Sequence, residues 1–175
     1  MGGLAGYNSG TISNSYSTGS VSGGYSVGGL VGDNLGTISN SYSTSNVSGG
    51  EGVGGLVGGN YYAMISNSFW DKVISGRTNM CGYEEYDDGA YCNDSYGKTT
   101  IQMKSFNTFS NAGWNISKTS ENINNGYPFL AWQVNNSSFV WLLYEQNGGG
   151  GDFNRICKAP SFGYNYLKNK RYIKC

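Results

Sequence analysis

The N-terminal part of the chain repeats one sequence pattern nearly three times. Residues 2–27 and 28–53 are identical at 19 of 26 aligned positions without a gap, and a weaker third copy spans residues 54–71. A fixed period of this length is typical of proteins built from stacked supersecondary units. Each unit is too small to enclose a core, so the copies are predicted to stack and share one.

Each copy is predicted to contain two or three short strands joined by corners. Residues 11–18 alternate strictly, which predicts that Ile12, Asn14 and Tyr16 lie on one face and the intervening serines on the other. Gly-Gly pairs, asparagines and serines bound the shorter extended segments, and these residue types permit tight corners. The predicted fold class is therefore all-β, a β-solenoid similar to a parallel β-helix with repeats of about 26 residues.

Stacking at about 4.8 Å per layer predicts ladders of equivalent side chains. The expected apolar ladders are Leu4, Leu30 and Leu56, and Ile12, Ile38 and Ile65. An amide ladder along the axis is expected from Asn14, Asn40 and Asn67. Tyr16 and Tyr42 are replaced by Phe69 in the third copy, which keeps the ring and loses the hydroxyl, so packing explains this position better than catalysis does.

The repeated pattern Gly-Gly-Leu-Val-Gly-x-Asn-x-Gly-Thr-Ile-Ser-Asn-Ser-Tyr-Ser-Thr-Gly resembles the GLUG motif of bacterial and archaeal surface proteins. Such motifs occur in large adhesins similar to filamentous haemagglutinin and in IgA-specific peptidases. The resemblance implies a β-solenoid exposed at a cell surface, and it implies no reaction. It extends to about residue 132 through runs such as Ser68-Phe69-Trp70-Asp71, but residues 77–96 depart from it.

The sequence divides into three segments. These are residues 1–71 with the repeats, residues 72–147 with a Cys-containing insert, a short helix and aromatic capping strands, and residues 148–175 with a Gly linker and a basic tail. A helix is predicted within residues 98–106, because Thr99 and Gln102 have the spacing of a capping box. The aromatic strands that follow the Asn125-Gly126 turn signal are expected to cap the end of the stack.

Four cysteines permit three disulfide pairings. We favour the local pairing, Cys81 with Cys92 and Cys157 with Cys175, because Cys81 and Cys92 bracket a segment rich in Gly, Asp and Tyr with little apolar core. The alternative of a structural metal site is disfavoured, since the chain has no Cys-x-x-Cys spacing and no histidine. Disulfides would agree with an exported protein.

Charge and hydropathy bear on partners and localisation. The formal net charge is zero, which argues against nucleic acid as a partner, and no stretch approaches the roughly 20 apolar residues that span a bilayer. Met1 is followed directly by the first repeat, so an export signal and further repeats of a longer parent chain are expected upstream. The expected localisation is extracellular or at the cell surface.

The absence of histidine excludes the Ser-His-Asp and Cys-His arrangements and the His-Glu-x-x-His metalloprotease helix. An acidic cluster, Glu84, Glu85, Asp87 and Asp88, suggests calcium binding or paired acid-base work, but its spacing fits a solvated loop tip better. We therefore predict no catalytic residue, no metal site and no cofactor.

The leading hypothesis is a non-enzymatic fragment of an adhesin-like surface protein that serves as a rigid spacer or contact surface. Its partner would be a surface glycan or a protein of a host or neighbouring cell. Sugar rings stack on exposed aromatic side chains, so the candidate ligand contacts are Tyr83, Tyr86, Tyr91 and Tyr96, with loop packing as the plainer alternative.

Two other functions remain open at this point. One is part of a carbohydrate-active β-helix enzyme, or the noncatalytic repeat region of a surface peptidase. The other is an ice-binding or crystalline-polymer-binding face, because Ser13, Ser15 and Ser17 and their equivalents are expected to form an outward hydroxyl lattice.

Overall fold

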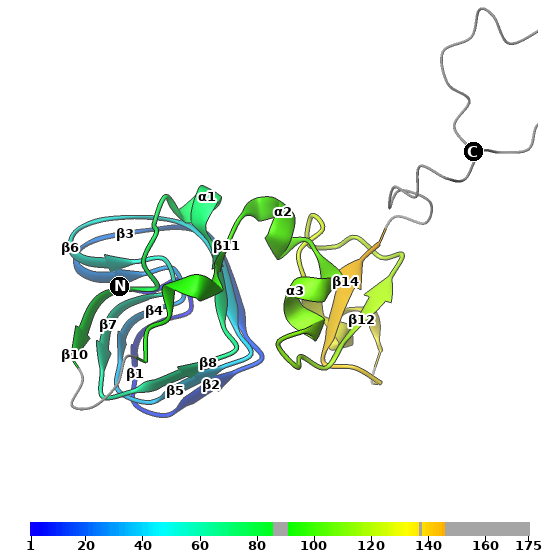
Figure 1. The fold of residues 1–175 in the computed structure, drawn as a ribbon, viewed down its shortest axis with the longest axis horizontal. Helices are drawn as coiled ribbons and strands as arrows, with labels where there is room; N and C mark the ends of the chain where they lie inside the picture. The colour runs from blue at the N-terminus through cyan, green and yellow to red at the C-terminus, as the bar shows by residue number, and fades with distance from the viewer. Residues whose placement is uncertain (86–90, 137, 146–175) are drawn as a thin grey trace, which may run out of the picture.

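The computed structural model describes residues 1–85, 91–136 and 138–145. Strands predominate in these residues and the helices are short (Figure 1). Three parallel sheets, named here after their first strands, make up the N-terminal part. The β1 sheet contains β1 (Ala5–Asn8), β4 (Val31–Asn34), β7 (Val57–Tyr61) and β10 (Cys81–Glu85). The β2 sheet contains β2 (Thr11–Ser13), β5 (Thr37–Ser39) and β8 (Met64–Ser66). The β3 sheet contains β3 (Tyr16–Gly28), β6 (Tyr42–Gly54), β9 (Phe69–Asp71) and β11 (Gly97–Lys98).

The strand register follows the sequence period. In the β2 sheet Ile12 pairs with Ile38, and Ile38 pairs with Ile65. Equivalent residues of the second and third copies are 26 residues apart at Asn34, which bonds to Asn60. After the next corner they are 27 residues apart, as in the bond between Ser41 and Ser68. The extra residue falls beside Tyr62, which has a left-handed φ of 50°. Parallel, in-register stacking of this kind is consistent with a β-helix-like fold.

Parallel pairing continues beyond residue 71, where the sequence comparison places the end of the repeats. Cys81 pairs with Val57, and Gly97 pairs with Trp70. Strands β10 and β11 therefore form a fourth, partial layer. Backbone hydrogen bonds hold this layer in place, so it needs no copy of the repeat motif.

The asparagine corners exchange the inward and outward faces of the chain. The corner residues Asn14, Asn40 and Asn67 have left-handed φ values of 46°, 46° and 45°. Before the corner Ile38 lies in a core with Leu30, whereas after it Tyr42 lies in a different cluster with Trp141. Strict alternation predicts that the isoleucines and tyrosines lie on one face of the strand, and this prediction is wrong. One left-handed residue between them interrupts the alternation of side chains, which repeats every two residues.

The core between the sheets is made by the repeated apolar residues. Leu30, Ile38 and Leu56 are fully buried, as the ladders predict, while Leu4 in the outermost layer is 48% exposed. Trp70 occupies the position of Ser17 and Ser43 and is also fully buried. Its ring fills the interior near the fourth layer, and its Nε1 donates to the Arg77 carbonyl at 3.0 Å. The core members are Leu30, Val31, Ile38, Leu56, Val57, Trp70, Met80 and Cys81.

A ladder of amide side chains runs through the interior. Asn8 Nδ2 donates to Asn34 Oδ1 at 2.7 Å, and Asn34 Nδ2 donates to Asn60 Oδ1 at 2.8 Å. Asn60 Nδ2 ends the series on the Ala63 carbonyl. Alternation predicts the ladder at the other asparagine of each copy instead, and that is wrong because those residues form the corners. Each interior amide is thus satisfied by its neighbour, as buried polar groups require.

The ends of the long strands β3 and β6 return against the β1 sheet. Gly58 of β7 allows this approach, because a Cβ there would overlap the main chain at Ser26 and Val27. Ser26 and Gly52, at equivalent places in β3 and β6, both have left-handed φ, which bends the strands. The close approach fixes the width of the space between these strand ends and the β1 sheet.

The elements outside the parallel sheets are short. They are α1 (Lys72–Ser75), η1 (Asp94–Tyr96), α2 (Thr100–Met103), α3 (Phe106–Ser110), β12 (Ile116–Thr119), β13 (Phe129–Leu130), η2 (Ala131–Val134) and β14 (Trp141–Tyr144). The predicted capping box begins α2, with Thr99 Oγ1 accepting from the Gln102 amide and Gln102 Oε1 accepting from the Thr99 amide. No helix among the described residues is long and apolar enough to cross a membrane.

Residues 100–145, called here the C-terminal module, pack on the outward face of the β3 sheet (Figure 1). Tyr42 and Phe69 of that sheet join an aromatic cluster with the module. The other members of the cluster are Met103, Phe109, Trp114, Ile116, Tyr127, Trp141 and Leu143. The module therefore covers the side of the stack and not the end, where the aromatic strands are predicted from the sequence to lie. Outward aromatic rings after the asparagine corner create the lateral docking surface.

Candidate functional site

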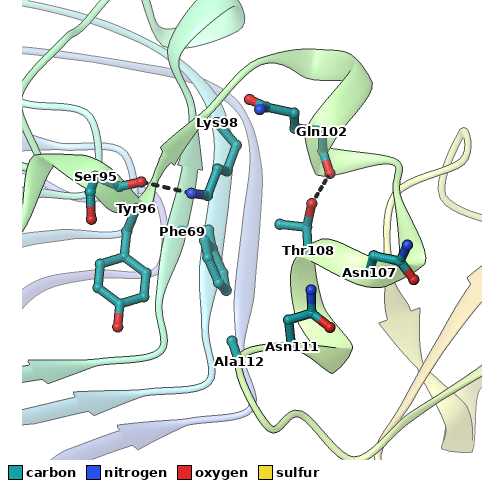
Figure 2. A pocket seen from close by; sticks show the side chains of 9 residues that line it. All are labelled: Phe69, Ser95, Tyr96, Lys98, Gln102, Asn107, Thr108, Asn111 and Ala112. Atoms are coloured by element: carbon teal, nitrogen blue, oxygen red, sulfur yellow. Dashed lines mark hydrogen bonds between the residues drawn. The ribbon is translucent and has the colours of Figure 1, made fainter.

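A hollow of about 340 Å³ lies between the β3 sheet and the C-terminal module (Figure 2). We call it the interface hollow. Strands β9 and β11 and helix η1 supply one wall, and helices α2 and α3 supply the other. The lining residues are Phe69, Ser95, Tyr96, Lys98, Gln102, Asn107, Thr108, Asn111 and Ala112.

The wall on the sheet side is aromatic and carries one cation. The rings of Phe69 and Tyr96 have centroids 5.3 Å apart and are tilted by 57°. Lys98 Nζ donates to the Ser95 carbonyl at 2.7 Å and lies 5.9 Å from the centre of the Phe69 ring. One hydrogen bond leaves the ammonium group with further donors. This wall thus offers ring faces and a positively charged hydrogen-bond donor.

The helical wall is polar. Gln102 is engaged in the capping box, and Thr108 Oγ1 donates to the Gln102 carbonyl at 2.7 Å. Asn107 lies on α3, and Asn111, which caps the C-terminus of α3 with helical dihedral angles, follows four residues later, so their side chains lie on the same face. Within the described residues neither carboxamide has a hydrogen-bond partner, and both are exposed. Two amide groups are thereby available to a ligand.

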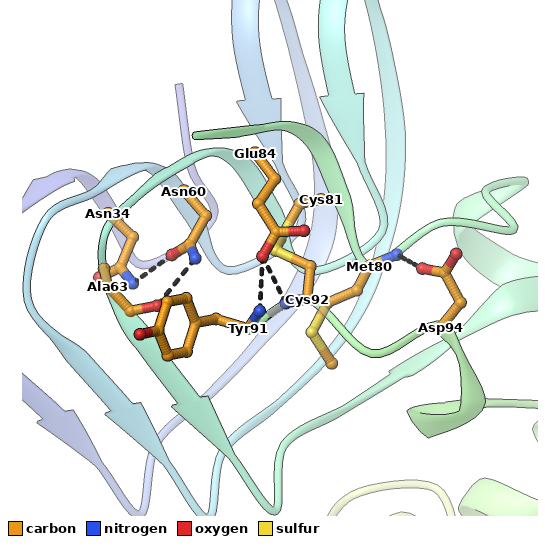
Figure 3. Close-up of a disulfide and its surroundings, with 9 residues drawn as sticks. All are labelled: Asn34, Asn60, Ala63, Met80, Cys81, Glu84, Tyr91, Cys92 and Asp94. Atoms are coloured by element: carbon orange, nitrogen blue, oxygen red, sulfur yellow. Dashed lines mark hydrogen bonds between the residues drawn. A yellow bond between two sulfur atoms is a disulfide. The ribbon is translucent and has the colours of Figure 1, made fainter. Parts of the chain in front are cut away.

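The Cys81–Cys92 disulfide, predicted from the sequence, holds the segment that leads to the hollow (Figure 3). The Cα atoms of the two cysteines are 6.0 Å apart. Glu84 Oε1 accepts from the main-chain amides of Tyr91 and Cys92 at 2.7 and 2.8 Å. Asp94 Oδ1 accepts from the Met80 amide at 2.7 Å. These bonds fix the start of η1, which carries Tyr96.

The same contacts account for the described part of the acidic cluster. Glu84 binds main-chain amides, and Glu85 Oε1 accepts from the Tyr62 hydroxyl at 3.2 Å. Asp87 and Asp88 lie outside the described residues. In the part of the chain that the structure describes, no three His, Cys, Asp or Glu side chains are grouped so as to hold a metal ion.

The predicted ligand-contact tyrosines do not gather in one place. Tyr96 lines the interface hollow, Tyr83 lines a second hollow, and Tyr91 lies beside the disulfide. Other predicted residues fall outside the described residues, namely Tyr86, Cys157, Cys175 and the tail of residues 148–175.

Sequence reasoning missed Phe69, Lys98, Asn107 and Asn111 as lining residues. The spacing of Asn107 and Asn111 is the signal that would have paired them, because it matches one helical turn.

The second hollow, of about 350 Å³, lies where the ends of β3 and β6 face the β1 sheet. We call it the tyrosine hollow. Its lining residues are Tyr25, Ser26, Glu51, Gly52, Tyr61 and Tyr83. The rings of Tyr61 and Tyr83 have centroids 5.7 Å apart and are tilted by 45°.

The outward hydroxyl lattice expected from the serines forms only in part, since Ser13, Ser39 and Ser66 pair in register and are exposed or half-buried. Ser17 and Ser43 point into the interior and are buried, and the Ser17 hydroxyl donates to the Gly29 carbonyl at 2.6 Å. The corner serines Ser41 and Ser68 are fully buried, and their hydroxyls donate to main-chain carbonyls. A binding face for ice or a crystalline polymer needs exposed, regularly spaced hydroxyls, and the rows that contain Ser17 and Ser43 do not provide them.

Comparison with known proteins bears on the repeats. The model of the GLUG motif matches residues 1–22 and residues 23–48. No curated protein and no solved structure matches the chain. The chain thus carries two GLUG motifs, and the matched residues lie within the first two layers of the stack, with the boundary between them inside β3.

Proposed function

We propose that this GLUG-motif chain is a non-enzymatic β-solenoid module of an exported, adhesin-like surface protein, and that it presents a glycan-binding site on a rigid scaffold. The observation that carries the proposal is the interface hollow. It combines aromatic rings with two carboxamides that have no partner among the described residues. A few convergent polar groups in an aromatic hollow are characteristic of ligand sites.

The chemistry of the two walls suits a saccharide. A pyranose ring has apolar C–H faces and polar edges, so the rings of Phe69 and Tyr96 would contact a face. Asn107 and Asn111 would each donate and accept hydrogen bonds at neighbouring hydroxyls. Lys98 adds a positive charge, which favours a sugar that bears a carboxylate.

The scaffold supports a role in holding such a site in position. The amide ladder, the in-register sheets and the aromatic cluster join both walls to one continuous body. Sites built on packed strands and helices keep their geometry better than sites on loops. A rigid stack that carries a side-facing site is suited to act as a spacer and a contact surface together.

Two observations support the non-enzymatic and exported character. The described carboxylates Glu84 and Asp94 accept hydrogen bonds from main-chain amides, which assigns them to structure. The Cys81–Cys92 disulfide suits an oxidising compartment, since such bonds are rare where thiols are kept reduced.

A glycan array probed with the full chain, followed by calorimetry with the best saccharide, tests the site. The double variant Asn107→Ala/Asn111→Ala should weaken binding about 30-fold, because two hydrogen bonds of about 1 kcal/mol each are lost. The control Asn46→Ala, an exposed asparagine on β6, should bind like the unmodified chain. An array without any bound glycan, or equal affinity for the double variant, would overturn the glycan-binding role.

A further inference from the structure

We propose that the tyrosine hollow binds an organic cation, specifically a quaternary ammonium group. This site lies apart from the interface hollow, shares no lining residue with it and does not depend on the glycan proposal. The proposal rests on the aromatic lining, on the placement of the carboxylates and on the kinds of polar group that the lining lacks.

Aromatic side chains from three strands converge on the hollow. Tyr25 comes from β3, Tyr61 from β7 and Tyr83 from β10, so the hollow crosses successive layers of the stack. Tyr25 is 73% exposed and Tyr83 is 50% exposed, which leaves their ring faces open to a ligand. Ring faces carry negative electrostatic potential and attract cations within about 6 Å.

The negative charge of the repeats is concentrated at this hollow. Asp33 and Glu51 are the only charged side chains in residues 1–70. Glu51 lines the hollow and pairs with Tyr25 across the β3 and β6 strands. Among the side chains of residues 1–70 there is no positive charge, so the Glu51 carboxylate favours a cation at this hollow.

Asp33 lies beside the same group of tyrosines. A Cβ built on Gly59 would lie 2.9 Å from Asp33 Oδ1 and 2.9 Å from Tyr61 Oη, so both oxygen atoms border one small space. Asp33 Oδ1 is buried and has no hydrogen-bond partner among the described residues. Burial and the nearby Asp33 carboxylate raise the pKa of the Tyr61 phenol, which is consistent with negative potential at this site.

The polar groups of the lining favour a cation over a sugar. No carboxamide, which donates and accepts at fixed positions of a planar group, is among the lining residues, and the lining's only charged group is the Glu51 carboxylate. A quaternary ammonium has no N–H group to satisfy, and its methyl groups pack directly on ring faces. Three tyrosines with a carboxylate at the rim meet both requirements.

One cation already touches a lining residue through the main chain. The amino group of Met1 donates to the Ser26 carbonyl at 2.6 Å. That bond uses a backbone oxygen, and among the described residues the Glu51 carboxylate has no ion pair. The carboxylate is therefore free to face a ligand.

Titration of the full chain with choline, followed by nuclear magnetic resonance of the tyrosine ring signals, tests the site. Choline should shift the signals of Tyr25, Tyr61 and Tyr83, and 3,3-dimethylbutan-1-ol, a neutral molecule of the same shape, should bind at least about tenfold more weakly. Added salt should weaken choline binding, because Glu51 is exposed.

Two variants and two matched controls assign the effect to the hollow. Glu51→Gln and Tyr25→Leu should each weaken choline binding about fivefold, and both positions are exposed enough to leave the fold intact. Glu121→Gln and Trp132→Leu alter an exposed acid and an exposed ring elsewhere and should change nothing.

Equal binding of choline and its neutral analogue would refute a cation site, as would unchanged choline affinity in Glu51→Gln. Absence of any choline-dependent shift would do the same. The Asn107→Ala/Asn111→Ala variant should keep its choline affinity, so failure of the glycan site and failure of this site are distinguished.

Discussion

Asp71 joins the stack to the C-terminal module through a single buried carboxylate. Its Oδ1 accepts from the amides of Val73 and Ile74 at the start of α1, and its Oδ2 accepts from the Tyr127 hydroxyl at 2.8 Å. The side chain is fully buried, so these bonds replace the water that a carboxylate otherwise requires. The residue that ends the third copy is thereby also an anchor of the module.

The bond to Asp71 predicts a pH dependence of stability. Burial, together with the hydrogen bond to Asp71 and the Asp71 charge, raises the pKa of Tyr127 to about 12. An unfolded tyrosine titrates near pH 10, so between about pH 10 and pH 12 the folded state holds a proton that the unfolded state has released. The contribution of Tyr127 to stability is complete below pH 10 and is lost as the pH rises toward 12.

Urea unfolding of the parent chain and of Tyr127→Phe, at pH 9 and at pH 11.5, checks this prediction. Tyr42 has a pKa raised well above its usual value, chiefly by burial, so the parent chain loses stability on the alkaline side from both residues. Tyr127→Phe should lose less stability between the two pH values. Equal losses in the two proteins would show that Tyr127 does not hold its proton more tightly in the folded state.

At the scale of elements, the amide ladder is the polar counterpart of the leucine and isoleucine ladders. Asn34→Ala should reduce the free energy of unfolding by about 2–4 kcal/mol, because it leaves an amide donor on Asn8 and an acceptor on Asn60 buried without their partner. Asn46→Ala, at an exposed position of β6, should change it by less than about 0.5 kcal/mol. Chemical denaturation of both variants measures the difference, and similar values for the two would refute the role of the ladder.

The disulfide stabilises the fourth layer in a way that depends on the length of the loop it closes. Cys81 and Cys92 are 11 residues apart, for which chain entropy predicts about 3 kcal/mol of stabilisation. Cys81→Ser/Cys92→Ser should lose about that amount and should weaken glycan binding, since the segment leading to Tyr96 is released. Denaturation of the variant and calorimetry with the glycan measure both effects. An unchanged glycan affinity would show that the Glu84 and Asp94 bonds position η1 without the disulfide.

The short elements show which features a sequence reveals and which it hides. Strand positions, the capping box at Thr99 and Gln102 and the local disulfide were predictable, because each depends on residues close together in the chain. The face of the strand on which Tyr42 lies was not predictable. The left-handed φ of Asn40 reverses that face, and asparagine adopts either the extended or the left-handed conformation. The fourth layer was not predicted, because its strands pair through backbone hydrogen bonds and their sequence does not repeat the motif.

At the scale of the whole molecule, the C-terminal module spans three layers of the stack. Trp141 Nε1 donates to Asn14 Oδ1 at 3.3 Å in the first layer, and Trp114 Nε1 donates to the Asn67 carbonyl at 2.8 Å in the third. Between them, the Tyr42 hydroxyl donates to the Pro128 carbonyl at 2.6 Å. The module and the stack should therefore unfold as one unit.

Trp141→Ala tests this coupling. The ring is fully buried against Tyr42 and Trp114, so its loss should reduce the free energy of unfolding by about 3–5 kcal/mol. In the parent chain, tryptophan fluorescence and far-ultraviolet circular dichroism should report one coincident transition. Two separate transitions in the parent chain would show that the stack and the module are independent.

Neither hollow could be assembled from the sequence, because each joins residues that are distant in the chain. The interface hollow brings Phe69 of the third copy to Asn107 of α3 and to its C-cap residue Asn111 across the module contact. The tyrosine hollow brings Tyr25 to Tyr83 across the layers. The tyrosines predicted from the sequence as ligand contacts include one member of each hollow, Tyr83 and Tyr96. Their partners follow only from the strand register and the docking of the module.

Because the first two copies are nearly identical, the repeats alone leave the register of the stack ambiguous by one whole layer. A strand shifted by one whole period would meet the same leucine, isoleucine and amide neighbours, so the repeats alone do not define which layer is which. Contacts that do not repeat from layer to layer remove this ambiguity. Among them, the C-terminal module spans the most layers, because it forms hydrogen bonds with Asn14 and Asn67 at the same time. The module therefore fixes the number of layers between Asn14 and Asn67. A copy inserted between those asparagines would break one of the two hydrogen bonds, whereas a copy added before Asn14 would extend the stack and leave both bonds intact.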